Sequence, residues 1–104
     1  MTTVDLVFEA LADGNRRAVL SRLAACETAT ATELSRELPL TRQGIAKHLA
    51  LLRQAGLVRP RRRGRETRYR ITPKPLGDAM AWIAAVGGEW DERLDALRRH
   101  LGDA

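Results

Sequence analysis

Hydrophobic residues in the first part of the chain recur at the spacing of one helix face. Val4, Phe8 and Leu11 lie three or four residues apart, which predicts a first helix. The sequence ADGN then interrupts the pattern, and Asp13 stands where an N-cap residue opens a second helix. The second helix is expected to bury a group of aliphatic side chains on one side, namely Val19, Leu20 and Leu23.

A short third helix is expected over about residues 31–38. The sequence TATE places Thr30 and Glu33 at the spacing of a capping box, in which each side chain accepts a hydrogen bond from a free backbone amide. Leu34 would face the core, and Pro39 would end the helix because proline cannot continue the hydrogen-bond ladder.

A longer fourth helix is expected over about residues 42–55. Thr41 stands at its N-cap position, and Gly56 follows its end, where glycine adopts the left-handed conformation without penalty. Together with the preceding short helix and tight turn, it predicts a helix-turn-helix. Its buried stripe would consist of Ile45, Leu49 and Leu52.

The pattern then changes to an alternation of every second residue, which is typical of a strand. The sequence RRGRE supplies a glycine for a tight reversal, and Pro60 belongs at a sheet edge because it cannot donate a hydrogen bond. We therefore expect a β-hairpin, or wing, over about residues 57–71. In its second strand, one face would carry Thr67, Tyr69 and Ile71, and the other would carry Arg68 and Arg70.

A last helix, over about residues 75–101, carries more apolar residues than one small domain covers. We expect Gly87–Gly88 to bend or break it. Its apolar face would pack against the same helix of a second copy, together with the first helix; packing wholly within the monomer is the alternative. The residues expected at this homodimer interface are Val4, Phe8, Ile83, Trp90, Leu94 and Leu97.

These elements predict a mainly α chain with a small β-hairpin wing, a winged helix-turn-helix that forms a single domain over residues 1–104 and dimerises through its terminal helices. The charge adds to this picture. Residues 41–74 hold eleven basic side chains and one acid, whereas the rest of the chain holds seven basic and twelve acidic side chains. A solvated surface normally interleaves both signs, so this polarity indicates a site for a polyanion.

Other features exclude several classes of protein. The single cysteine, Cys26, can form neither an internal disulfide nor a thiolate cluster, which fits a reducing cytoplasm. The start of the chain does not resemble a signal peptide, and no stretch approaches the roughly 18 apolar residues that cross a bilayer. We find no nucleophile–base pair, phosphate-binding glycine loop or convergent carboxylates. We therefore expect a cytoplasmic protein without catalytic residues, cofactor or membrane contact.

The stretches FEALADGNRRAVLSRLA and KHLALLRQAGLV, with the arginine-rich wing after them, resemble the ArsR (arsenic-repressor) family of bacterial winged-helix repressors. The match runs from about Val7 to Leu101. The C-terminal AMAWIAAVGGEWDERLDALRRHL is similar to a branch of the family that is not known chiefly for metal sensing. The resemblance implies a homodimeric transcriptional repressor of double-stranded DNA operators with two-fold symmetry.

The resemblance also allows the family's metal sites to be checked. Zinc needs three or four converging nitrogen, sulfur or oxygen ligands. The thiolate site would fall where this chain has no cysteine, and in the second site only Asp78 matches, so we expect no metal sensor. The residues found instead of the expected ligands are Ser35, Arg36 and Glu37 at the first site and Met80, Asp91 and Leu94 at the second.

The N-terminal end of the fourth helix is expected to enter the DNA major groove, where arginine and lysine read guanine and glutamine reads adenine. Gly44 would allow close approach to the bases or, equally, close packing within the helix-turn-helix. His48 would lie between helix and DNA in a structural or phosphate-contacting role, in preference to a metal or catalytic one. The expected DNA contacts are Thr41, Arg42, Gln43, Gly44, Ala46, Lys47 and His48 on the helix and Arg62, Arg63, Arg65 and Arg68 on the wing.

Two alternatives stay open. A winged helix can bind RNA or a protein, but single-stranded RNA recognition uses exposed aromatics, and the one aromatic in the basic segment, Tyr69, is expected to face inward. A ligand- or redox-responsive regulator could use Cys26, although nothing basic flanks this residue in the sequence and no second cysteine could resolve an oxidised form.

Overall fold

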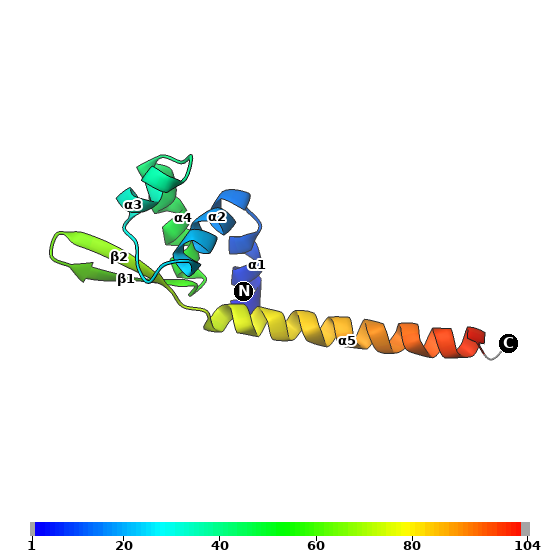
Figure 1. Cartoon of the computed structure of the whole chain (residues 1–104). Helices are drawn as coiled ribbons and strands as arrows, with labels where there is room; N and C mark the ends of the chain where they lie inside the picture. The colour runs from blue at the N-terminus through cyan, green and yellow to red at the C-terminus, as the bar shows by residue number, and fades with distance from the viewer. Residues whose placement is uncertain (1, 103–104) are drawn as a thin grey trace.

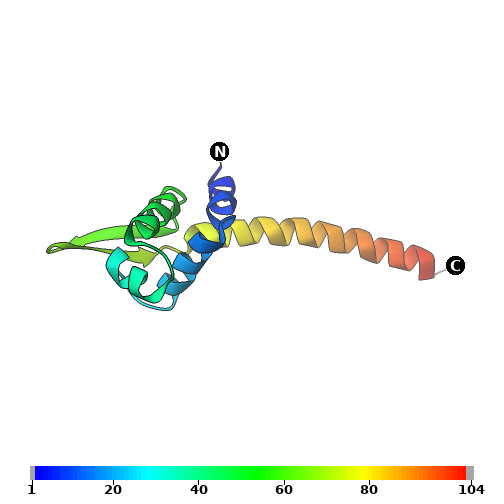
Figure 2. The same cartoon turned by 90° about the horizontal axis from the view of Figure 1, so that it is seen from above.

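The computed structural model describes residues 2–102 of the chain, which form five helices and one two-stranded sheet. In chain order the elements are α1 (Thr3–Leu11), α2 (Gly14–Ala24), α3 (Ala31–Glu37), α4 (Arg42–Gln54), β1 (Val58–Arg63), β2 (Glu66–Ile71) and α5 (Lys74–Gly102). The first four helices and the base of the hairpin form one body, and α5 projects from it (Figures 1 and 2). The predicted mainly α architecture with a hairpin wing is confirmed.

The helices begin at the residues that the sequence indicates. Thr30 and Glu33 form the capping box of α3, because Thr30 Oγ1 accepts from the Glu33 amide at 3.0 Å and Glu33 Oε1 accepts from the Thr30 amide at 2.9 Å. Asp13 caps α2 by accepting from the amide of Asn15, and Thr41 caps α4 by accepting from the amide of Gly44. Local side-chain chemistry therefore sets the helix starts.

The core lies between the first four helices and the base of the hairpin. The predicted stripe of α4 is fully buried, with Ile45, Leu49 and Leu52 each 0% exposed. Val19, Leu20 and Leu23 of α2 are also buried, as predicted. In α1 the buried residues are Val7 and Ala10, and Phe8 lies on the exposed side.

The wing is an antiparallel hairpin that pairs Val58 with Ile71 at its base and Arg63 with Glu66 at its tip. Gly64 takes the turn with a φ of 62°, a left-handed conformation that favours glycine. On the other side of β2, the backbone of Tyr69 pairs with Ala29 through two hydrogen bonds, of 2.8 and 3.0 Å. This leaves β1 as the edge strand, so Pro60 lies at an edge as predicted.

Helix α5 runs without interruption from Lys74 to Gly102. The helix therefore does not break at Gly87–Gly88, so the expected break is wrong, and neither glycine has a positive φ. A glycine within a helix costs only about 1 kcal/mol relative to alanine. The good helix formers on both sides of the pair outweigh this penalty.

Most of α5 has no cover within the monomer. Only Ala79 of this helix is buried among the described residues, although α5 also packs against α1 through an edge-to-face contact of Phe8 with Trp82 at a centroid distance of 5.5 Å. Packing wholly within the monomer is thus wrong. The large apolar side chains of α5 that stay exposed are Met80, Trp82, Ile83, Val86, Trp90, Leu97 and Leu101.

Candidate nucleic-acid interface

The N-terminal end of α4 presents polar and small side chains to solvent. Burial of the opposite stripe fixes the rotation of the helix, which leaves Arg42, Gln43, Ala46 and Lys47 exposed, as predicted. Thr41 is exposed as well, and since its hydroxyl oxygen accepts from the Gly44 amide, its hydroxyl hydrogen is available to donate. This end of α4 has the chemistry to contact base edges and phosphates.

Gly44 is half-buried inside the corner between α3 and α4. A Cβ atom at this position would lie 3.1 Å from Thr41 Oγ1, the oxygen that caps the helix. The local geometry therefore supports the packing interpretation of Gly44, because a larger residue would disturb the cap.

A groove of about 590 Å³ lies between the α3–α4 corner and the wing. Arg42 and Ala46 line it from α4, and Arg62 and Arg65 line it from the wing. Residues about twenty positions apart in the sequence thus share one hollow, in which arginines outnumber the two acids, Glu33 and Glu66, that also line it. Arg36, at the end of α3, also lines the groove. Arg36 occupies a position where the family's thiolate site would need a cysteine and is not among the predicted DNA contacts; its basic side chain in the last turn of the first helix of the corner was the available signal.

Arg63 lies on the other face of the hairpin. Successive strand residues point to opposite faces, so Arg62 faces the groove while Arg63 does not line it. The three arginines predicted near the wing tip are therefore divided between two sides.

Arg68, predicted as a DNA contact, is engaged by the protein itself. Its guanidinium donates to Thr28 Oγ1 at 2.8 Å and pairs with the carboxylates of Glu33 and Glu66, each at 3.0 Å. Its side chain is only 22% exposed. The hydrogen bond with Glu66 is the main cause that raises the pKa of Arg68, so the group stays charged. Arg68 ties β2 to the start of α3 and fixes the wing against the helix-turn-helix.

His48 also lies away from the exposed end of α4. At 100° per residue it is about 140° around the helix from Gln43. It faces the start of α2, where the pKa of Asp13 is lowered chiefly by the backbone amides of Arg16 and Asn15 and, to a smaller extent, by Arg16 and His48. Its Nδ1 is buried without a hydrogen-bond partner in the described part of the chain. This placement supports the structural role, one of the two roles expected for His48.

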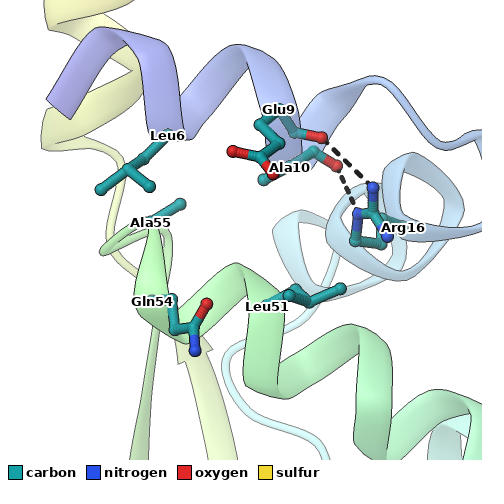
Figure 3. A pocket seen from close by; sticks show the side chains of 7 residues that line it. All are labelled: Leu6, Glu9, Ala10, Arg16, Leu51, Gln54 and Ala55. Atoms are coloured by element: carbon teal, nitrogen blue, oxygen red, sulfur yellow. Dashed lines mark hydrogen bonds between the residues drawn. The ribbon is translucent and has the colours of Figure 1, made fainter. Parts of the chain in front are cut away.

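A second hollow, of about 70 Å³, lies between α1, α2 and α4 (Figure 3). Arg16 closes one end of it by donating from Nε to the carbonyl of Ala10 at 2.8 Å and from Nη2 to the carbonyl of Glu9 at 3.2 Å (Figure 3). A cation at these carbonyls caps the C-terminal end of α1. Arg16 is therefore a structural link between α1 and α2.

Cys26 is half-buried, and its Sγ lies 3.4 Å from the carbonyl of Arg22. It shares a hollow with Arg70, so one basic residue that is distant in the sequence lies near it in space. Within residues 2–102, no three His, Cys, Asp or Glu side chains come together in a way that could hold a metal ion. None of the helices described is long and apolar enough to cross a membrane.

The sequence is similar to known transcriptional regulators. Residues 11–61 match a family model described as a helix-turn-helix domain. An HTH-type transcriptional regulator of Mycobacterium tuberculosis is 42% identical over 89 residues, which cover 81% of this chain and 82% of that protein. The arsenical resistance operon repressor of Escherichia coli is 31% identical over 99 residues, which cover 91% of this chain and 81% of that protein.

Two solved structures share the fold over most of the chain. An ArsR-like transcriptional regulator from Rhodococcus sp. RHA1 has a TM-score of 0.82 at 38% identity, and the match covers 93% of this chain and 91% of that one. A homodimeric winged helix-turn-helix DNA-binding domain from Mycobacterium bovis, a possible ArsR-family regulator, has a TM-score of 0.65 at 29% identity, covering 90% and 83%. The predicted winged helix-turn-helix is thus confirmed.

The link between the wing and α3 predicts an acid-sensitive fold. The pKa of Glu33 lies below its usual 4.5, chiefly because the Thr30 amide donates to it and also because Arg68 is near. Since the folded state lowers this pKa, the contribution of Glu33 to stability is fully present above its unfolded value of 4.5. That contribution is lost as the pH falls through the folded-state value.

We expect the unfolding free energy to decrease from pH 6 to pH 3 in urea titrations, and Glu33→Gln to be less stable at pH 7 and to show a flatter decrease. Asp5, Asp13 and Glu37 also have lowered pKa values, so part of the decrease should remain. Glu27→Gln, in the exposed loop before α3, is the control and should retain the wild-type slope. An unchanged slope in Glu33→Gln would contradict the prediction.

Proposed function

We propose, from the premise that this chain belongs to the ArsR family of winged helix-turn-helix transcriptional regulators, that it is a homodimeric repressor that binds double-stranded operator DNA. Members of this family are regulators and not enzymes. The observation that carries the proposal is the groove in which Arg42 of α4 and Arg62 and Arg65 of the wing come together. An excess of positive charge beside the exposed N-terminal end of α4 suits the phosphate backbone that borders the DNA groove into which a recognition helix inserts.

In this proposal α4 reads the base sequence. The helix is about 20 Å long, and the major groove of B-form DNA, about 12 Å wide, admits a helix. Arg42 and Lys47 would read guanine, Gln43 would read adenine, and Ala46 would let the backbone approach the bases. Thr41, with its free hydroxyl hydrogen, is suited to a phosphate.

The wing supplies affinity that does not depend on sequence. Arg62 and Arg65 face the same groove as Arg42, where they would meet the phosphates beside the bases that α4 reads. Arg36 would add a further phosphate contact from α3. Tyr69, the one aromatic of the basic segment, lines the groove but is half-buried against the core. A single half-buried ring is a poor platform for stacking successive bases, which favours duplex DNA over single-stranded RNA.

The homodimer would form through α5 and α1. The exposed apolar face of α5, together with Phe8, is larger than a monomeric protein normally leaves in water. The related domain from Mycobacterium bovis is described as homodimeric, which supports the same assembly here. A two-fold dimer would place its two α4 helices on half-sites about 34 Å apart, so we propose an operator with two-fold symmetry.

Base recognition by α4 can be tested on the operator itself. An operator can be located by footprinting the DNA upstream of the protein's own gene. Arg42→Ala and Gln43→Ala should each reduce the preference for this operator over a scrambled duplex by roughly 5- to 150-fold, because each bidentate contact contributes about 1–3 kcal/mol of discrimination. Fluorescence anisotropy with both duplexes measures the ratio. Gln54→Ala, at the far end of α4, is the control; an unchanged ratio in Arg42→Ala and Gln43→Ala would refute the role of α4.

Assembly of the homodimer can be tested by substitution in α5. Trp90→Ala should weaken the dimer tenfold or more in sedimentation equilibrium, because truncating a large interface aromatic typically costs about 2 kcal/mol or more. Glu92→Ala is the matched control, since Glu92 lies about 200° around α5 from Trp90. A wild-type protein that sediments as a monomer at micromolar concentration would argue against the homodimer.

The response of the protein to metal ions can be tested directly. We propose that the repressor has no metal sensor of the family type, because Ser35, Arg36 and Met80 occupy positions where ligands are required. Equilibration with zinc or cobalt should therefore leave operator affinity within about twofold of its metal-free value, a change of roughly 0.4 kcal/mol. Stoichiometric metal binding that releases the DNA would overturn this part of the proposal.

A further inference from the structure

The hairpin register divides the wing arginines between two faces, because cross-strand partners point to the same side of a sheet. One set of pairs, which we call the inner face, consists of Val58 with Ile71, Pro60 with Tyr69, and Arg62 with Thr67. The other set, which we call the outer face, consists of Arg59 with Arg70, Arg61 with Arg68, and Arg63 with Glu66.

The inner face is turned toward the helix-turn-helix. At its base Val58 is buried, and Tyr69 and Ile71 pack against the core. Toward the tip, Arg62 and Thr67 line the groove that contains Arg42. The inner face is therefore the side that would meet DNA held by α4.

Apart from Glu66 at the tip, which lines the groove, the outer face is turned away from it. Four of its residues, Arg61, Arg63, Arg68 and Arg70, line a separate hollow of about 80 Å³ together with Thr28. None of the residues lining this hollow comes from α4. A duplex seated on α4 and the inner face would therefore leave the outer face facing the DNA beyond the wing.

The outer face holds a strong excess of positive charge. It has one acid, Glu66, and this acid pairs with Arg68, whose other donors are directed to Thr28 and Glu33. Within residues 2–102, no ion pair or hydrogen bond engages the guanidinium groups of the remaining four arginines, which are all exposed; they are Arg59, Arg61, Arg63 and Arg70.

This arrangement is unfavourable without a partner. Arg59 stands directly opposite Arg70, and like charges in that position destabilise a hairpin. The hairpin register keeps these two side chains opposite each other, and Arg68 with the backbone pairing of Tyr69 to Ala29 holds the hairpin to the body. A polyanion on the outer face would remove the repulsion and gain several charge-assisted hydrogen bonds.

We propose that the outer face is a second phosphate-binding surface, which holds the backbone of DNA that flanks the segment contacted by α4 and the inner face. This inference rests on the proposed function. Stacked sheets lie about 10 Å apart, which shows how much room the side chains on the faces of a sheet occupy. The DNA minor groove is only about 6 Å wide, so a hairpin with arginines on both faces cannot lie wholly inside it. The two faces would instead grip two separate stretches of backbone, one on each side of the wing.

The test uses two duplexes. The short duplex is the shortest operator fragment to which Arg42→Ala binds more weakly than the wild type, and the long duplex adds ten base pairs of unrelated sequence at each end. Anisotropy titrations over a range of salt concentrations give the affinity and its salt dependence for both. We expect the wild type to bind the long duplex tenfold or more tightly than the short one at low salt.

The double variant Arg61→Ala/Arg70→Ala should lose this gain and bind the short duplex as the wild type does. On the long duplex alone, its salt slope should flatten by about 0.9 for each phosphate contact removed. Arg61→Lys/Arg70→Lys, which keeps the charge, should restore most of the gain. The contrasting variant Arg62→Ala/Arg65→Ala, on the groove side, should weaken both duplexes alike. Thermal unfolding verifies that each variant is folded.

Several outcomes would overturn the inference. If Arg61→Ala/Arg70→Ala changed neither duplex, or weakened both equally, the outer face would not be a separate site for flanking DNA, while the proposed function would stand. If the wild type bound a nucleoside triphosphate, and the double variant lost that binding but kept the affinity gain on the long duplex, the outer face would be a site for small polyanions. If the wild type bound neither duplex, the proposed function and this inference would fail together.

Discussion

The burial of one stripe of α4 is the constraint on which the arrangement of the candidate interface depends. Ile45, Leu49 and Leu52 have no exposed surface, so the helix cannot rotate without placing apolar side chains in water. This fixed rotation directs Arg42 and Gln43 outward and turns His48 toward α2. The chemistry offered to DNA is therefore a consequence of packing on the opposite side of the same helix.

The wing depends on a second set of contacts, which are polar. Arg68 connects β2 to Thr28 and to the capping box of α3 through Glu33, and the backbone of Tyr69 pairs with Ala29. Without these contacts, only the apolar packing at the hairpin base would attach the wing to the body. Arg68 thus helps to hold the other wing arginines in place, toward the groove on one face and away from it on the other.

Helix α5 shows how a short chain can leave its largest apolar surface uncovered. A chain of 104 residues has one small core, and α1 to α4 with the hairpin base already enclose it. The body covers only the beginning of α5, where Ala79 is buried and Trp82 meets Phe8. An exposed helix face of this length is favourable only when a second molecule covers it, which joins the fold to the proposed dimer.

The sequence by itself determined the caps at Asp13, Thr30 and Thr41, the buried stripe of α4 and the division of the wing into faces. These features depend on contacts within a few residues and on the periods of helix and strand, which backbone geometry fixes. The tertiary structure decided the role of Arg68, because its partner Thr28 lies 40 residues earlier in the chain. It likewise decided which part of the protein lies beside His48 and grouped Arg36 with Arg42 and Arg62. The sequence shows which residue types a chain carries and at what spacing. The partner of each charged side chain depends on which distant segment lies beside it in the folded protein.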